Sequence, residues 1–249
     1  MPFERQPSAD HAAGPVAATP GLAVVIPVYN EATNIPGLLR DWQPVFEATG
    51  VPYAIFCIDD GSTDNGPDLL QRCQASDPHL HIYRQPNAGH GPAILWGYAL
   101  AGDAEWIFQL DSDHQLDPAA FATLWEQRTG YDLLLGQRRQ KHVSIARRWL
   151  SRLAVLTVRW LYGASVGDAN CPYRLMRGTL LQEALKRLPA DSFAPNILMT
   201  SWFILKKKRI FTTVVEHRKE GLRPSRMSSY MIRGALRSGW QTVLFRFRS

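Results

Sequence analysis

Cysteine is scarce in this sequence. The chain contains three cysteines, Cys57, Cys73 and Cys171, which lie far apart and form no Cys-x-x-Cys pair. A disulfide-stabilised secreted scaffold or a cysteine-ligated zinc site requires more cysteines at closer spacing. The cysteine content therefore argues against both classes and favours a reduced, cytoplasmic protein.

Long uninterrupted hydrophobic runs are also missing. About 18 uncharged apolar residues are needed to cross a bilayer, and the longest candidate, residues 150–166, contains Arg152 and Arg159. Residues 1–21 are rich in Ala, Pro, Gly and Ser and lack the basic start and apolar segment of a signal peptide. We therefore expect a disordered leader over residues 1–21 and a chain that does not cross a membrane, although it could lie on one.

The composition is that of one globular domain, with a net charge that is unevenly spread. Hydrophobic residues make up 45% and charged residues 20% of the sequence, and the net charge is +6. After residue 203 basic side chains far outnumber Glu216 and Glu220; they are Lys206, Lys207, Lys208, Arg209, Arg218, Lys219, Arg223, Arg226, Arg233, Arg237, Arg246 and Arg248. A basic segment of this kind favours phosphate groups in nucleic acid, anionic lipid or a substrate.

Short apolar segments alternate with helical patterns through the first half of the chain. Strands are predicted at residues 22–27, 53–58, 79–84 and 106–110, and helices at 31–49, around Leu69 and Leu70, and at 93–101. Ser62 or Thr63 is the predicted cap of the second helix. This alternation predicts a parallel sheet with right-handed crossovers.

The second half of the chain has a less regular pattern. Helices are predicted at 144–166, 179–187 and 230–247, a strand at 210–215, and either helix or strand at 196–205. The expected organisation is one domain over residues 22–229, followed by a basic amphipathic helix over 230–249.

Three predicted strands end in polar, loop-forming clusters: PVYNE, DDGSTD and DSDHQ. Ligands of parallel sheets bind beyond the carboxyl ends of the strands. The side chains expected along this edge are those of Tyr29, Asn30, Glu31, Asp59, Asp60, Asp111 and Asp113. The sequence therefore predicts one binding site at this edge.

The Asp111-Ser112-Asp113 segment directly follows an apolar strand. Two carboxylates separated by one residue can converge on a divalent cation, which would neutralise a diphosphate. Asp59 is a candidate for a hydrogen bond to a nucleobase, and Asp60 for a place near a sugar or the metal, although one of them could simply cap a helix. Tyr29 suits stacking on a base, and Asn87 begins a glycine-rich turn that could approach a phosphate.

Four segments together resemble the inverting glycosyltransferases of family 2, namely VIPVYNE (25–31), IDDGSTD (58–64), NAGHGPA (87–93) and QLDSDHQLDP (109–118). The resemblance implies an α/β fold, the GT-A Rossmann-like domain with a mostly parallel central sheet flanked by helices. It also implies that Pro27, Tyr29, Glu31 and Asp59 surround the base and ribose of a nucleotide-sugar. Asp111 and Asp113 would then lie at the diphosphate with a Mg²⁺ or Mn²⁺ ion.

The second half is similar to the polyprenyl-phosphate branch of this family, which includes dolichol-phosphate mannose synthases and bacterial undecaprenyl-phosphate glycosyltransferases. This resemblance implies that Gln115 is a third metal ligand and that Asp168 is a catalytic residue alongside Asp113. It also implies acceptor-phosphate contacts from Arg138, Arg147, Arg174 and Arg218, with Arg223 and Arg226 as alternatives to the last.

The predicted function is metal-dependent, inverting transfer of a sugar from a UDP- or GDP-sugar to a polyprenyl phosphate. A phosphate acceptor is already an anion and needs positioning more than a base, whereas a hydroxyl acceptor would need Asp168 as general base. Transfer to a hydroxyl of a glycan or small molecule, and a nucleotide-binding module without turnover, both stay open. We expect a cytoplasmic protein, peripheral at the inner face of an anionic membrane, with no nucleic-acid partner.

Overall fold

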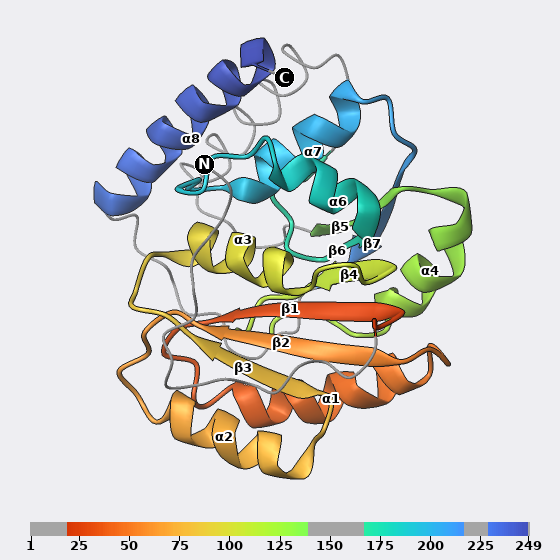
Figure 1. The fold of residues 1–249 in the computed structure, drawn as a ribbon, viewed down its shortest axis with the longest axis vertical. Coiled ribbons are helices and arrows are strands. Elements are labelled where there is room, and N and C mark those ends of the chain that lie inside the picture. Colours follow the sequence, from red (N-terminus) through yellow and green to blue (C-terminus); the bar gives the residue numbers. More distant parts are fainter. Residues whose placement is uncertain (1–18, 139–166, 217–228, 249) are drawn as a thin grey trace.

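The computed structural model describes residues 19–138, 167–216 and 229–248 of the chain. A seven-stranded sheet organises these residues, in the order β3-β2-β1-β4-β6-β5-β7 (Figure 1). The strands are β1 (Leu22–Val28), β2 (Tyr53–Asp59), β3 (Leu80–Arg84), β4 (Trp106–Gln109), β5 (Leu133–Arg138), β6 (Arg174–Arg177) and β7 (Ile210–Val215).

Six of the seven strands run in the same direction. β1 pairs in parallel with β2 and β4, β2 with β3, and β5 with β7, whereas β6 is antiparallel to both β4 and β5. The carboxyl ends of β1, β2, β4 and β5 therefore meet at one edge of the sheet. Because β6 is reversed, its first residue lies at this same edge, where Arg174 is paired with Gln109.

Helices cover both faces of the sheet, with α1 and α2 on one side and α3, α6 and α7 on the other (Figure 1). Their bounds are α1 (Ile35–Glu47), α2 (Gly66–Ser76), α3 (His90–Leu100), α4 (Ala120–Gln127), α6 (Gly178–Leu185), α7 (Pro195–Leu205) and α8 (Ser229–Arg248), with a short 3₁₀ helix at Arg128–Gly130. Within the described residues no helix has the length and apolar character required to span a bilayer.

Alternate residues of each central strand pack on opposite faces, which gives two hydrophobic layers. Val24 packs in the layer that contains Trp42 of α1, and its neighbour Val25 packs in the layer that contains Trp96 of α3. A strand buried on both faces must be apolar throughout, which explains the unbroken LAVVIPV sequence of β1. α3 lies especially close to the sheet, because a Cβ at Gly97 would be 2.4 Å from Val25 Cγ1.

The structure confirms the predicted α/β architecture and refines several elements. The helix expected from residue 31 begins at Ile35, because residues 31–34 form a turn in which Glu31 O accepts hydrogen bonds from Asn34 N and Ile35 N. The predicted capping of α2 is wrong: the helix has Asn65 at its N-cap, and the Ser62 hydroxyl accepts a hydrogen bond from Asn30 N. The ambiguous segment 196–205 is helical. α4, β5 and β6 were not predicted, and the helix predicted at 144–166 lies outside the described residues.

Candidate active site

A cavity of about 780 Å³ opens at the carboxyl ends of β1, β2, β4 and β5. It is lined by residues 27–29, 31, 60, 87–94, 111–113, 138, 170, 172, 191–196 and 237. The predicted residues Pro27, Tyr29, Glu31, Asp60, Asn87, Asp111, Asp113 and Arg138 are therefore brought together around one space. Asp59, Gln115, Asp168 and Arg174 are not part of this lining, and Arg147 and Arg218 lie outside the described residues.

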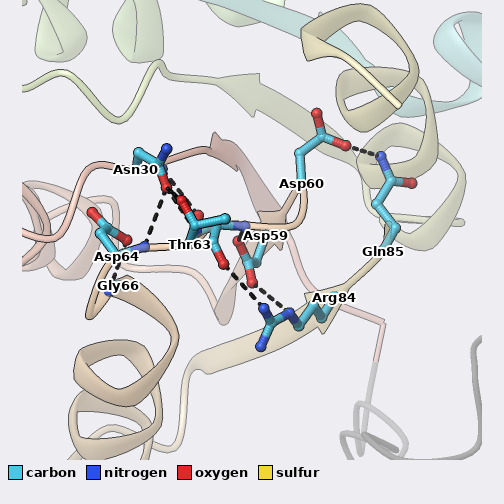
Figure 2. Close-up of polar contacts among 9 residues, drawn as sticks. Asn30, Asp59, Asp60, Thr63, Asp64, Gly66, Arg84 and Gln85 are labelled. Atoms are coloured by element: carbon cyan, nitrogen blue, oxygen red, sulfur yellow. Dashed lines mark hydrogen bonds and ion pairs between the residues drawn. The ribbon is translucent and has the colours of Figure 1, made fainter. Parts of the chain in front are cut away.

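Asn30 fixes the loop that follows β1. Its φ of 54° turns the chain sharply after the strand, and its backbone N donates to Ser62 Oγ at 3.0 Å. Its side-chain Oδ1 accepts hydrogen bonds from the backbone N atoms of Thr63 and Asp64 at 2.8 and 3.3 Å (Figure 2). These contacts tie the ends of β1 and β2 together and leave the neighbouring Tyr29 side chain 48% exposed at the cavity wall.

Asp59 and Asp60 point to opposite sides of the end of β2 and have different partners (Figure 2). Asp59 Oδ1 accepts a hydrogen bond from Ser62 N at 2.9 Å, and its Oδ2 lies 3.1 Å from Arg84 Nε. Asp60 accepts hydrogen bonds from Gln85 Nε2 at 2.7 Å and from the backbone N atoms of residues 88 and 89 at 2.8 and 2.9 Å. Both carboxylates are buried. Asp60 therefore holds the glycine-rich turn against the sheet while it faces the cavity.

The carboxylates of Asp111 and Asp113 lie in the turn after β4. Asp111 Oδ1 is buried and has no hydrogen-bond partner, and Nε2 of His90, at the start of α3, lies 3.6 Å from it. Asp113 Oδ1 accepts a hydrogen bond from Gln115 N at 3.2 Å. Burial raises the pKa of Asp113 to about 6, and the negative charge of Asp111 is the second largest cause of this shift. Two partly buried carboxylates thus share a site in which their charges repel.

This pair fits a divalent cation that is shared with a diphosphate. Mg²⁺ commonly binds one or two carboxylates and completes its shell with phosphate oxygens and water. In residues 19–138, 167–216 and 229–248, no three His, Cys, Asp or Glu side chains are grouped as a complete protein cage would need. The Asp111 oxygen without a hydrogen bond and the charge repulsion at Asp113 suit an open site, in which a substrate supplies the remaining ligands.

Arg138 and Asp168 form an ion pair at the opposite wall of the cavity. Arg138 ends β5, and its Nε and an Nη donate to the two oxygens of Asp168 at 2.7 and 3.2 Å. Burial disfavours the guanidinium charge, but Asp168 outweighs this effect and holds the pKa of Arg138 above its ordinary value. β5 ends at the same edge of the sheet at which the segment leading into β6 enters it. This brings Arg138 and Asp168 together. Asp168 therefore orients Arg138 toward the cavity.

Arg174 connects backbone segments and does not line the cavity. Its side chain is fully buried, and its guanidinium donates to the backbone oxygens of Ala169, Cys171 and Asn196 at 2.8 to 3.1 Å. These bonds join the segment before β6 to α7. The predicted contact between Arg174 and an acceptor phosphate has no support in this placement, because the guanidinium is already enclosed by carbonyl oxygens.

Residues 191–196, which precede α7 and form its first turn, make a cavity wall that was not predicted from the sequence. They pack tightly on the start of α3, where a Cβ at Gly91 would be 1.9 Å from Ser192 O. Gly91 belongs to the N-x-G-x-G-x-A segment, so this glycine was visible in the sequence. The segment that it contacts lies about a hundred residues away and carries no motif of its own.

A family model described as "Glycosyl transferase family 2" matches residues 23–203. Two curated relatives are named undecaprenyl-phosphate 4-deoxy-4-formamido-L-arabinose transferase. The relative from Pseudomonas fluorescens (strain SBW25) is 34% identical over 178 residues, which cover 70% of this chain and 52% of the relative. The relative from Pectobacterium atrosepticum is 32% identical over 184 residues, which cover 72% and 55%. The chain thus spans about half the length of the curated relatives it matches.

Two solved structures share the fold at low sequence identity. Glucosyl-3-phosphoglycerate synthase from Mycobacterium tuberculosis, solved with Mn²⁺, UDP and glucosyl-3-phosphoglycerate, aligns with a TM-score of 0.63 and 18% identity over 92% of this chain and 80% of its own. A mannosyltransferase from Pyrobaculum calidifontis, solved with GDP-Man and Mn²⁺, aligns with a TM-score of 0.60 and 20% identity over 94% and 67%. Both likenesses concern the fold, and they confirm the predicted GT-A architecture.

Proposed function

The chain belongs to glycosyl transferase family 2, and from this premise we propose that it moves a sugar from a nucleotide-sugar to a polyprenyl phosphate. The observation that carries the proposal is the single cavity at the ends of β1, β2, β4 and β5. An exposed aromatic ring, two carboxylates and an arginine line it, from Tyr29, Asp111, Asp113 and Arg138. This set can hold a base, a diphosphate and an acceptor phosphate side by side.

The loop after β1 is the proposed nucleoside site. Tyr29 offers its exposed ring to the base, and Pro27 and Glu31 line the same wall. Asp60 supports this site by holding the turn that begins at Asn87 and lines the cavity. Asp59 acts from behind the lining, by fixing Ser62 N and Arg84 at the end of β2 and β3.

Asp111 and Asp113 are the proposed ligands of Mg²⁺ or Mn²⁺, with Gln115 as a further ligand from the same turn. When bound, the cation neutralises the diphosphate and stabilises its departure from the sugar. The two carboxylates follow a buried strand, which holds their backbone in place. A site on a rigid strand end keeps the leaving group in a fixed position relative to the acceptor.

The proposed reaction is a displacement at the anomeric carbon of the sugar. An acceptor phosphate oxygen forms the new bond on one face while the bond to the diphosphate breaks on the other, and the nucleoside diphosphate leaves. The configuration therefore inverts. Since the acceptor is already an anion, no side chain has to remove a proton. Arg138, oriented by Asp168, positions the acceptor phosphate by charge-assisted hydrogen bonds.

The state of Asp168 favours a phosphate over a hydroxyl acceptor. A general base must lie within hydrogen-bond reach of the attacking hydroxyl. Asp168 is not part of the cavity lining, and both of its oxygens are turned to Arg138, from which they accept hydrogen bonds. The names of the curated relatives, which specify undecaprenyl phosphate, support the same acceptor class.

An enzyme that uses a lipid acceptor must contact the membrane surface. We propose that this chain acts at the cytoplasmic surface of the membrane. α8 presents Trp240, which is 64% exposed, and the exposed Arg246. Tryptophan and arginine together suit the interface of an anionic bilayer.

The test is a transfer assay with UDP- and GDP-sugars, with and without undecaprenyl phosphate, in Mn²⁺, in Mg²⁺ and after chelation. We expect release of nucleoside diphosphate that requires both the lipid phosphate and the metal. Release that ignores the lipid but responds to a hydroxyl compound would move the acceptor to that class. Binding of nucleotide with no release under any condition would leave a binding module.

A further inference from the structure

α8 reaches the cavity from beyond the part of the chain that matches the family model, which ends at residue 203. It packs on α7 and on the segment before it (Figure 1). Gly234 admits the ring of Phe193, because a Cβ there would be 2.1 Å from the ring, and Gln241 Oε1 accepts a hydrogen bond from Phe193 N at 3.4 Å. These contacts, together with buried Phe245, hold the helix in place.

Arg237 is the residue that α8 contributes to the cavity lining. Its guanidinium pairs with Asp191, and the two side chains are 53% and 68% exposed. Arg138, also in the lining, forms a less exposed ion pair. Its side chain is 26% exposed and that of its partner Asp168 is 15% exposed. Exposed ion pairs contribute little to stability, so Arg237 can leave Asp191 at small cost. Arg138 is bound more firmly to Asp168.

Within the described residues, acidic side chains of the lining outnumber basic ones. Glu31, Asp60, Asp111, Asp113 and Asp191 line the cavity with Arg138 and Arg237. Arg138 is paired with Asp168, and a cation at Asp111 and Asp113 would offset only part of the remaining negative charge. Phosphate groups brought by a donor or acceptor add further negative charge. An arginine can bind a phosphate through two parallel hydrogen bonds.

We propose that Arg237 binds a phosphate oxyanion in this cavity and that Asp191 holds its guanidinium until the anion arrives. The identity of the anion, a donor diphosphate or an acceptor phosphate, rests on the proposed function. Asp191 acts as a competitor for the guanidinium, so the two residues of the pair have opposite effects on anion affinity. An ion pair that served only to attach α8 would give both residues the same effect.

The experiment measures binding rather than turnover, by titration calorimetry on the full chain with Mn²⁺. The probes are UDP and GDP for the donor diphosphate and farnesyl phosphate, a short soluble prenyl phosphate, for the acceptor. The variants are Arg237→Gln and Asp191→Asn. Arg40→Gln is the control, because it removes the same charge from another exposed ion pair, with Asp41, that lies outside the lining. Thermal unfolding of each variant verifies that it is folded.

We expect Arg237→Gln to weaken binding of one probe about 10-fold, as loss of a charge-assisted hydrogen bond predicts. Asp191→Asn should strengthen binding of the same probe about twofold to threefold, and Arg40→Gln should change it little. The affected probe identifies the donor or the acceptor as the source of the anion.

Equal losses in Arg237→Gln and Asp191→Asn, or wild-type affinity in Arg237→Gln, would overturn the proposal. Either result leaves the proposed transfer untouched, because the wild-type chain would still bind the probes. A wild-type chain that binds no probe would contradict this inference and the proposed function together.

Discussion

The two walls of the cavity are built in different ways. The wall formed by the ends of β1, β2 and β4 consists of short segments that directly follow buried strands, and backbone hydrogen bonds to Asn30 and Asp60 hold it. The opposite wall consists of the end of β5, residues 170 and 172, residues 191–196 and α8. Ion pairs, Arg138 with Asp168 and Arg237 with Asp191, set the position of its cations. The first wall is therefore preorganised, and the second can respond to its ligand.

The largest effect is expected at the first wall, from Asp113→Asn. Loss of a metal-binding carboxylate should lower turnover by roughly 1,000-fold, which corresponds to about 4 kcal/mol. The same variant should unfold at an equal or higher temperature than wild type without metal, because it removes a buried charge beside Asp111. Steady-state kinetics measures the loss of turnover, and thermal unfolding measures the change in stability. Turnover and metal dependence that survive the substitution would show that the metal assignment is wrong.

Asp60→Ala should destabilise the same wall. It removes the acceptor of three hydrogen bonds and leaves the donors at residues 85, 88 and 89 unpaired, at a cost of about 3 kcal/mol. Urea unfolding measures the loss. Asp64→Ala is the matched control, since Asp64 accepts two backbone hydrogen bonds at an exposed position and should cost much less. Equal losses would mean that Asp60 does not hold the turn more firmly than Asp64.

Gly91→Ala tests the junction between the two walls. The added Cβ would meet Ser192 O at 1.9 Å, and overpacking of this kind destabilises by about 2 kcal/mol. Gly130→Ala is the control, because a Cβ there meets nothing within 4 Å. Thermal unfolding of both variants gives the comparison. A stable Gly91→Ala protein with normal nucleotide affinity would show that residues 191–196 can move away from α3.

The smallest effect is expected from Asp168→Asn at the second wall. The change weakens the ion pair that orients Arg138, and we expect the KM for the lipid acceptor to rise about 10-fold. Affinity for the nucleotide should stay within about twofold, because the contacts of the first wall are unchanged. If kcat fell with every acceptor and the KM did not move, Asp168 would be acting as a base rather than orienting Arg138.

The difference between the walls also explains what the sequence could predict. The first wall is local: each polar cluster stands directly after its own strand, so Tyr29, Asp60, Asp111 and Asp113 were found from adjacency alone and all line the cavity. Helix starts were less predictable, because a turn such as 31–34 has the same spacing as the first turn of a helix.

The second wall depends on long-range packing, which a linear pattern does not contain. Asp191 and Ser192 reach the cavity only because Gly91 and Phe193 dock their segment between α3 and α8. Arg174 shows the opposite case: it has the residue type expected for a phosphate ligand, but tertiary burial directs its donors to carbonyl oxygens. Burial of a charged side chain is decided by the assembled fold.

The reversed strand β6 gives the molecule a modular character. Since β6 alone runs against its neighbours β4 and β5, the chain enters the sheet at the edge where the others leave it. Residues 170 and 172, in the segment that enters β6, therefore line the cavity although they do not follow the end of a strand. Substitutions in this segment can be made without touching the ends of β1, β2 and β4, so the proposed acceptor side is a separate target for redesign.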